Sequence, residues 1–247
     1  MSNLVIDFGN SRIKLAVFTN HKLIHSQIYD LLEETCIVEL ITKYNIQNSI
    51  ISSVRADLSI FEEILESQTN YIRFSAERQK SVKLTYKTPQ TLGLDRLAAV
   101  IAASSIYPNQ NCLVIDAGTC ITYDMVNSEN IYSGGSISPG LNMRFQAMHS
   151  QTGRLPLLVA DESFTEYKGN DTETSMRSGV QYGMYCEIIG FIESYYSRFP
   201  GLKILLSGGD AKFFDTRLKS SIFAHTLKNE PHLVLIGLNE VIYHQND

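Results

Sequence analysis

Short polar turns interrupt apolar runs from the start of this chain. Residues 4–6 and 12–18 predict two buried strands, and the residues between these runs read DFGNS. Because a short turn joins the two apolar runs, we expect a β-hairpin whose turn carries the polar side chains. The next run, KLIHSQIYD, predicts a third antiparallel strand.

The second half of the chain repeats this opening. The segments CLVIDAGTC, ITYDMVNSE and NIYSGGSI predict three further strands, and Asp116 occupies the place that Asp7 has in the first hairpin. Apolar residues with helical spacing follow each set of strands. We therefore expect a duplicated α/β unit, with lobes at residues 1–108 and 109–247 and a cleft between the lobes.

The predicted helices cover the segments between and after these strands. They lie at residues 31–44, 59–67, 92–108, 140–153 and 175–199, and a strand or turn leads into a last helix near the C-terminus. Ser59 is a predicted N-cap, because Glu62 follows it three positions later. The longest helix contains Gly179, Gly183 and Gly190, which we expect to allow close packing against another element.

Composition narrows the class of protein. The chain has 247 residues, of which 44% are hydrophobic and 19% are charged, and these proportions predict a packed core. The net charge of -5 does not favour nucleic-acid binding, which normally uses a basic face. No apolar run approaches the roughly 20 residues that a membrane helix needs. Without a signal-peptide pattern at the N-terminus, we expect a cytoplasmic protein with no membrane or nucleic-acid partner.

The chain contains four cysteines, Cys36, Cys112, Cys120 and Cys186. Their neighbours are apolar and none of them forms a CxxC pair. We therefore expect reduced, buried cysteines, and the spacing gives no indication of a structural zinc site.

The two polar turns have the residues that phosphate binding needs. In DFGNS and DAGTC, glycine permits close approach of a ligand to the backbone, and Asn10, Ser11 or Thr119 supplies a side-chain donor. An aspartate repels phosphate, but it can hold a cation that bridges to phosphate. Lys14 would add a positive charge to the first turn. A single D-x-G segment is also an ordinary turn, whereas two copies in matching contexts favour phosphate binding.

Three other segments each allow two interpretations. In LGLDR, Asp95 either stabilises a helix N-terminus or acts as a general base, while Arg96 is able to bind an anion. The segment GGSISPGL, residues 134–141, is either a structural corner or a substrate wall beside a helix N-terminus. The turn SGGD, residues 207–210, either ends a strand or admits a nucleoside.

An ordered set of motifs resembles one family. The motifs are DFGNSRIK, YKTPQTLGLDR, DAGTCITYD, GGSISPGL, TGRLP, DTETSMRSG and LSGGDA, and they span residues 7–211. In these motifs and their order, the chain resembles the type III pantothenate kinases, including the Bvg accessory factor branch, within the acetate kinase/Hsp70/actin superfamily. The resemblance implies an α/β fold of two duplicated ribonuclease H-like lobes, as in actin-like ATPases, with a cleft between the lobes.

The resemblance also implies an activity. This is ATP-dependent phosphorylation of pantothenate to 4'-phosphopantothenate, the first step of coenzyme A synthesis. The implied enzyme is a homodimer that requires Mg²⁺ and a monovalent cation, either potassium or ammonium.

Residue roles follow from the same resemblance. Asp95 would accept the proton of the pantothenate hydroxyl, Asp116 would bind the monovalent cation, and Tyr86 and Thr172 would contact pantothenate. The other implied contacts are Gly93, Leu94 and Arg96 for pantothenate, and Asp7, Phe8, Gly9, Asn10, Ser11, Arg12, Ile13, Lys14 and Thr119 for ATP.

The chain departs from the family pattern at a few positions. Ser11 stands where threonine is usual, and Cys120 stands where alanine is usual. DTETSM replaces a segment that usually begins with Asn-Thr, so the role of Asp171 is open while Thr172 remains. None of these changes removes a catalytic group.

Two other functions compete with this interpretation. A different small-molecule kinase on the same fold would act on a sugar or a carboxylate, but the GLDR segment together with Tyr86 argues against it. A non-catalytic regulatory protein would bind nucleotide or pantothenate without turnover, and the intact set of polar residues argues against that.

Overall fold

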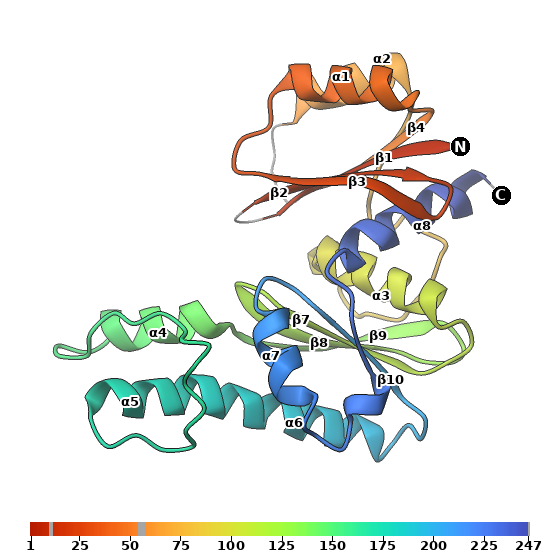
Figure 1. The fold of residues 1–247 in the computed structure, drawn as a ribbon. Helices are drawn as coiled ribbons and strands as arrows, with labels where there is room; N and C mark the ends of the chain where they lie inside the picture. The colour runs from red at the N-terminus through yellow and green to blue at the C-terminus, as the bar shows by residue number, and fades with distance from the viewer. Residues whose placement is uncertain (10–11, 54–57, 247) are drawn as a thin grey trace. The chain divides into compact units, whose positions relative to one another are not determined.

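A computed structural model of the chain describes residues 1–9, 12–53 and 58–246 (Figure 1). The chain forms two compact units. The first consists of Met1–Asn109, Val126–Ser133 and His232–Asp247, and the second consists of Gln110–Met125 and Gly134–Pro231.

A five-stranded sheet between two pairs of helices makes up most of the first unit (Figure 1). The strand order is β3-β2-β1-β4-β5, with β1 (Ser2–Phe8), β2 (Ile13–Thr19), β3 (Lys22–Tyr29), β4 (Asn48–Ser53) and β5 (Asn70–Arg73). Strand β2 runs antiparallel to β1 and β3, whereas β4 runs parallel to β1 and β5. One face is covered by α1 (Glu34–Tyr44) and α2 (Ser59–Gln68), and the other by α3 (Leu94–Ile106) and α8 (Leu233–Asn246).

The uninterrupted apolar character of β1 follows from this layering, because both faces of the strand are covered. Leu4, Ile6 and Phe8 belong to the buried cluster that also contains residues of α1 and α2. The alternate residues Asn3 and Val5 are also fully buried, and they project from the opposite face. A strand that is buried on both faces shows a continuous apolar run instead of an alternating pattern.

A row of asparagine amides links this sheet to α8. Asn70 donates a hydrogen bond to Asn48 (3.3 Å), Asn48 donates to Asn3 (2.9 Å), and Asn3 donates to Asn239 of α8 (2.9 Å). A buried amide that loses its partner is costly. The row therefore fixes the position of α8 along the first sheet.

The second sheet repeats the topology of the first. Its strands are β7 (Cys112–Ala117), β8 (Cys120–Val126), β9 (Ile131–Pro139), β10 (Lys203–Ser207) and β11 (Leu227–Asn229), in the order β11-β10-β7-β8-β9. Read from β9, this order matches β3-β2-β1-β4-β5, and β10 again runs parallel to both of its neighbours. The predicted duplication is therefore confirmed. A short strand, β6 (Lys83–Leu84), continues the sheet beyond β9 by pairing with Ile131 and Tyr132.

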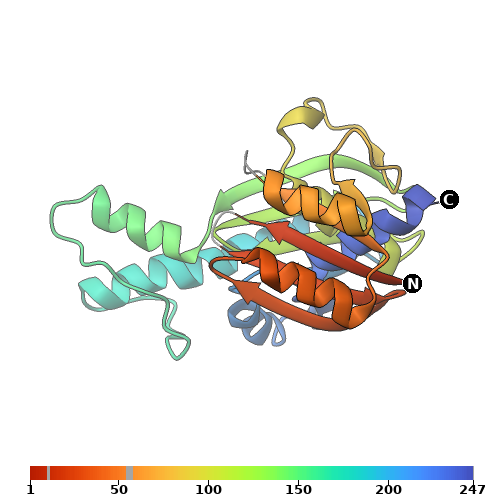
Figure 2. The ribbon, with the colours of Figure 1, turned by 90° about the horizontal axis from the view of Figure 1, so that it is seen from above.

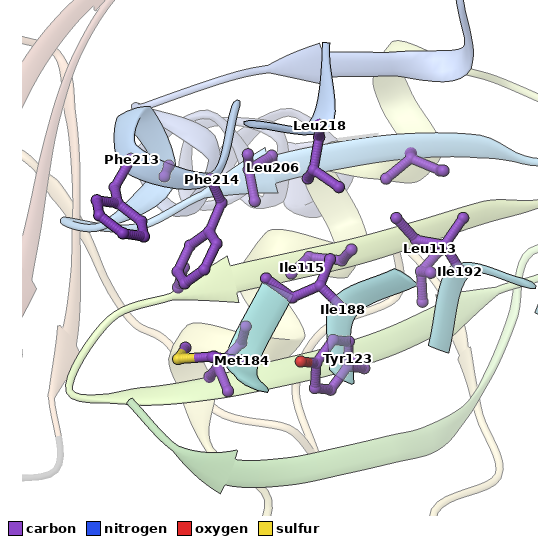
Figure 3. Close-up of a cluster of buried hydrophobic side chains, with 14 of the residues drawn as sticks. Leu113, Ile115, Tyr123, Met184, Ile188, Ile192, Leu206, Phe213, Phe214 and Leu218 are labelled. Atoms are coloured by element: carbon purple, nitrogen blue, oxygen red, sulfur yellow. The ribbon is translucent and has the colours of Figure 1, made fainter. Parts of the chain in front are cut away.

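Helices α6 (Gly183–Tyr196) and α7 (Ala211–Leu218) supply much of the core of the second unit (Figure 3). Leu113 and Ile115 of β7 and Tyr123 of β8 pack with Ile188 of α6 and Phe214 of α7, and all five are fully buried. Helices α4 (Leu141–Ser150) and α5 (Thr172–Arg177) lie side by side at one end of this unit (Figures 1 and 2). Two short 3-10 helices, η1 (Pro89–Thr91) and η3 (Ala224–Thr226), lie in connecting segments.

The long helix predicted at residues 175–199 has an interruption. It consists of α5, a π-helical turn η2 (Ser178–Tyr182) and α6, so the helical run extends from Thr172 to Tyr196. The close packing predicted for its glycines is wrong. In the described part of the chain, a Cβ atom added at Gly179, Gly183 or Gly190 would meet nothing within 4 Å.

The structure corrects two further predictions. Leu58, not Ser59, is the N-cap of α2, and Ser59 is the first helical residue, because the carbonyl oxygen of Leu58 already accepts a hydrogen bond from the N–H of Glu62 (3.0 Å). All four cysteines are free, but burial was predicted correctly only for Cys112: Cys36 and Cys120 are partly exposed, and Cys186 is exposed. Cys186 lies on the side of α6 opposite the buried Met184 and Ile188, so apolar neighbours in sequence did not indicate its exposure.

The compact units do not coincide with the two sequence repeats. The predicted lobes at residues 1–108 and 109–247 follow the sequence repeat, whereas the last helix of the second repeat, α8, packs within the first unit. Within the described residues, no helix combines the length and the apolar character that crossing a membrane requires.

Candidate active site

The first polar turn follows β1 in the first unit. Asp7 is only 6% exposed, and Lys14 of β2 lies opposite it in the antiparallel register. The N–H of Gly9 donates to the carbonyl oxygen of Arg12 (3.1 Å), and a Cβ atom at Gly9 would lie 3.0 Å from the same oxygen. The turn therefore suits glycine and brings the carboxylate, the lysine and backbone polar groups to one end of the hairpin.

The predicted ATP contacts of this turn differ in what they can offer a ligand. Phe8 and Ile13 are each 2% exposed and pack in the core, with the Phe8 ring 5.5 Å from the ring of Phe61. Only their backbone atoms are therefore available to a ligand. Arg12 is exposed, while Asn10 and Ser11 lie outside the described residues.

Asp95 lies in the first turn of α3, where Gly93 is the N-cap. Its Oδ1 accepts a hydrogen bond from the backbone N–H of Arg96 (2.8 Å), and its side chain is exposed. A Cβ atom at Gly93 would lie 2.6 Å from this Oδ1, so the absence of a side chain at 93 makes room for the carboxylate. The helix dipole favours the negative charge at this position.

Other predicted pantothenate contacts lie around the start of α3. Leu94 is half-buried and Arg96 is 7% exposed, whereas the neighbouring Asp95 is exposed. Tyr86 is half-buried and stacks on Tyr132, with the ring centroids 6.4 Å apart. Helix η1 is the short connection between Tyr86 and this helix start.

The second polar turn follows β7 in the second unit. The N–H of Gly118 donates to the carbonyl oxygen of Cys120 (3.0 Å), and Thr119 is exposed at the tip. Asp116 Oδ1 would lie 3.6 Å from a Cβ atom at Gly118 and 2.5 Å from one at Gly208. Gly208 therefore makes room for this carboxylate, whereas a Cβ atom at Gly118 would be in ordinary van der Waals contact with it.

The SGGD segment forms part of the same site. Gly208 has a φ of +98°, which glycine adopts readily, and a Cβ atom there would lie 2.3 Å from the carbonyl oxygen of Ala117. The N–H of Asp210 donates to that oxygen (2.9 Å), and burial raises the pKa of the Asp210 carboxyl. The strand-end turn is thus packed against the second polar turn. Sequence reasoning did not predict the contribution of Gly208 to the space around Asp116.

The GGSISPGL segment supports this turn from another side. Gly140 is the N-cap of α4, and its N–H donates to the carbonyl oxygen of Thr119 (3.1 Å). A Cβ atom at Gly140 would lie 2.2 Å from the carbonyl oxygen of Gly118. Only Gly140 of the segment forms a close-packed corner, where β9 leads into α4, because residues 134–139 are the end of strand β9.

Thr172 is the first residue of α5 and lines an open pocket of about 690 Å³. Asp171 is the N-cap of α5, and its carboxylate accepts hydrogen bonds from the backbone N–H and the hydroxyl of Thr174 (2.8 Å each). These bonds lower the pKa of Asp171. The open role of Asp171 is thereby assigned to helix capping, and the D-x-x-T spacing is the sequence signal that could have indicated it. Met148 and Leu155 supply apolar walls to the pocket.

The predicted site residues thus fall into two groups. Asp7–Lys14, Tyr86 and Gly93–Arg96 belong to the first unit, and Asp116, Thr119 and Thr172 belong to the second. Across the described ranges, no group of three or more His, Cys, Asp or Glu side chains is arranged to hold a metal ion.

Comparison with known proteins identifies close relatives. A family model described as type III pantothenate kinase matches residues 3–194. The type III pantothenate kinase of Phocaeicola vulgatus is 43% identical over 241 residues, which cover 97% of each chain. That of Christiangramia forsetii is 41% identical over 244 residues, again covering 97% of each chain.

Solved structures agree on the fold. A ROK hexokinase from Thermus thermophilus aligns with a TM-score of 0.53 at 13% identity, over 100% of both chains. The activator of the 2-hydroxyisocaproyl-CoA dehydratase from Clostridium difficile, with bound ADPNP, gives a TM-score of 0.53 at 9% identity, over 100% of this chain and 95% of the other. The expected fold class, two duplicated ribonuclease H-like lobes of the actin-like ATPase type, is confirmed.

Proposed function

We propose that this chain, which belongs to the type III pantothenate kinase family, phosphorylates pantothenate with ATP. The product is 4'-phosphopantothenate, and the reaction is the first step of coenzyme A synthesis. The observation that carries this proposal is the similarity, over 97% of the chain, to proteins named for this activity. Nothing in these relatives supports the non-catalytic binding protein considered above.

Asp95 is the general base of the proposed reaction. Its Oδ1 is occupied by the Arg96 N–H, and its exposed position leaves Oδ2 accessible to a substrate hydroxyl. The primary hydroxyl of pantothenate attacks the γ-phosphorus of ATP in line, and Asp95 takes the hydroxyl proton. The new bond joins the pantothenate oxygen to phosphorus, the bond from phosphorus to the bridging oxygen breaks, and ADP leaves.

Pantothenate would be held by residues around Asp95 and by Thr172. Gly93 and Leu94 precede the base at the start of α3, Arg96 follows it, and Tyr86 lies across η1 in the same unit. The Thr172 hydroxyl offers a donor in the lining of the pocket beside α5.

ATP would be held through its phosphates by the two polar turns. In the first, Asp7 to Lys14, backbone N–H groups and the Lys14 charge would bind phosphate oxygens. In the second, Thr119 would donate from the exposed tip. Donors that are already in place stabilise the charge that develops during transfer.

The proposed reaction uses two kinds of cation. Asp116 is the proposed ligand of a monovalent cation, potassium or ammonium, because it lies near the end of its strand, as Asp7 does in the first hairpin, and hard cations take oxygen ligands. A family of ATP-dependent kinases also uses a divalent metal, here proposed to be Mg²⁺, which when bound neutralises charge on the phosphates.

The proposed enzyme acts in the cytoplasm as a homodimer, with no nucleic-acid or membrane partner. This part of the proposal rests on the family resemblance and on the net charge of -5.

A coupled assay of ADP release tests the function and its base together. It contains ATP, Mg²⁺ and pantothenate, with and without potassium, and compares the wild type with Asp95→Asn. We expect potassium-stimulated turnover, lowered about 10²–10⁴-fold in Asp95→Asn. The exposed Asp30 provides a matched control, and Asp30→Asn retains wild-type turnover. Absence of turnover with pantothenate in a folded wild type would overturn the proposed acceptor, and full activity of Asp95→Asn would remove Asp95 from its role.

A further inference from the structure

A polar network lies in the second unit where α4 and α6 meet the strands. Glu187 of α6 accepts a hydrogen bond from the Tyr123 hydroxyl through Oε1 (2.9 Å) and pairs with Arg144 of α4 through Oε2 (2.5 Å). Ser138 joins both partners, because its hydroxyl donates to Glu187 (3.3 Å) and accepts from Arg144 (3.0 Å). Both Glu187 oxygens are therefore engaged.

Burial makes this network costly to break. The side chains of Arg144 and Glu187 are 21% and 24% exposed, and Tyr123 is fully buried. Burial, together with the nearby Glu187 charge, raises the pKa of Tyr123, so its hydroxyl stays protonated and donates. Removing one partner of a largely buried pair leaves the other charge without compensation.

The network reaches the second polar turn through one short segment. Nε of Arg144 donates to the carbonyl oxygen of Pro139 (2.8 Å), and the next residue, Gly140, donates its N–H to Thr119 (3.1 Å). Gly140 is also packed directly on the carbonyl oxygen of Gly118. The segment 138–140 is thus held by Arg144 and Glu187 on one side and supports the turn on the other.

We propose that Arg144 and Glu187 are positioning residues for the turn Asp116–Thr119, and thereby for ATP and its monovalent cation. Neither side chain needs to touch a ligand. Arg144 acts because its planar guanidinium holds Pro139 through Nε and Glu187 through its terminal nitrogen at the same time. The inference rests on the proposed function, because that function assigns the cation to Asp116 and an ATP contact to Thr119.

The first unit offers a chemically matched control. There Glu62 accepts hydrogen bonds from Tyr71 (2.6 Å) and Arg73 (2.5 Å), and its side chain is 23% exposed. This triad has the same three residue types as Tyr123, Glu187 and Arg144, but it lies between α2 and β5. Glu62→Gln therefore reports what the loss of such a triad does to stability alone.

The experiment compares Glu187→Gln, Arg144→Lys and Glu62→Gln with the wild type. It measures KM for ATP, KM for pantothenate, the potassium concentration for half-maximal activation and the thermal midpoint. We expect Glu187→Gln and Arg144→Lys to raise KM for ATP and the potassium requirement roughly tenfold, with KM for pantothenate nearly unchanged. Glu62→Gln lowers the thermal midpoint without changing the kinetic constants.

Two results would overturn the inference. One is a Glu187→Gln enzyme that loses stability as Glu62→Gln does while its ATP and potassium constants stay at wild-type values. The other is an equal change in all three constants, which would indicate general distortion. ATP binding measured by calorimetry, with and without potassium, separates this inference from the proposed function, because it needs no acceptor. Wild type that binds ATP but does not phosphorylate pantothenate defeats only the proposed function.

Discussion

Gly237 of α8 lies directly against the backbone of Ala98 in α3. A Cβ atom at position 237 would stand 1.8 Å from the carbonyl oxygen of Ala98, 2.6 Å from its carbonyl carbon and 3.2 Å from the amide nitrogen of Ala102. All three are backbone atoms, so they move only if the helix moves. Ala98 and Ala102 are fully buried, and the two helices therefore cross at the glycine.

Gly237→Ala will destabilise the protein. Alanine is favoured over glycine inside a helix by about 1 kcal/mol, but the forced separation of the helices costs roughly 1–3 kcal/mol as overpacking. Urea unfolding measures the net loss. Gly190→Ala in α6 is the control, because a Cβ atom there meets nothing within 4 Å, and it should be neutral or stabilising. Equal stability of the two variants would contradict the close crossing.

Gly93→Ala will lower turnover more than it lowers stability. The new Cβ atom would lie 2.6 Å from Oδ1 of Asp95, so the carboxylate must leave its place over the helix N-terminus. A misplacement of about 1 Å in a reacting group costs about 10²-fold in rate. Steady-state kinetics and a thermal melt on the same sample test this. Wild-type kcat in the variant would show that Asp95 does not need this position.

Asp210→Asn will raise stability at neutral pH. Burial raises the folded-state pKa of Asp210 above its ordinary value of 3.8, so the charged form is disfavoured in the folded protein. The gain is present above the folded pKa and disappears as the pH falls through it toward the unfolded value, because both states are then protonated. Unfolding midpoints of the wild type and the variant, measured from pH 7 down into the acid range, test how this stability difference depends on pH.

Asp171→Ala will lower stability at neutral pH, which is the opposite effect. Hydrogen bonds from Thr174 lower the folded pKa of Asp171, so the carboxylate stabilises α5 above the unfolded pKa and loses this effect as the pH falls through the folded pKa. The variant should be less stable at neutral pH, with a difference that shrinks in acid. The same direction of change in both variants would refute the burial argument for Asp210.

Thiol labelling will distinguish the cysteines. Cys112 is fully buried, and burial raises the pKa of its thiol to about 12, so it carries little thiolate in the folded state. It should react with a thiol reagent only after denaturant is added, whereas the exposed Cys186 is available in the native protein. Peptide mapping of the labelled sites, with Cys112→Ser as the control, shows which cysteine reacts in the native protein and which reacts only after denaturation. Rapid native labelling at Cys112 would contradict its burial.

Local patterns were sufficient to predict the repeated strands and most helices. The apolar runs around Asp7 and Asp116 are continuous because both β1 and β7 are buried, and the turns that end them contain glycine. The sequence also predicted Gly93–Arg96 as the start of a helix, which α3 confirms. The short edge strands β5, β6 and β11 were not predicted, because runs of two to four residues show too little periodicity.

Contacts between distant segments could not be predicted in this way. Gly190 and Gly237 both lie within apolar helices, yet only Gly237 meets another backbone. Arg144 and Glu187 lie on different helices, and the residues around each of them in the sequence do not indicate that the two side chains pair. The catalytic role of Asp95 stays a prediction, because a carboxylate at a helix start has the same local sequence whether it binds substrate or only stabilises the helix.

The row of asparagines from Asn70 to Asn239 has a consequence for the order of events during synthesis. Helix α8, which covers one face of the first sheet, is translated after all the strands of both sheets. Strands β1 to β5 are translated long before it, so Asn3 and Asn48 cannot complete their amide row until α8 emerges. Nascent domains usually fold from the N-terminus onward, but here the unit that contains β1 is completed only after the segments of the second unit have been translated.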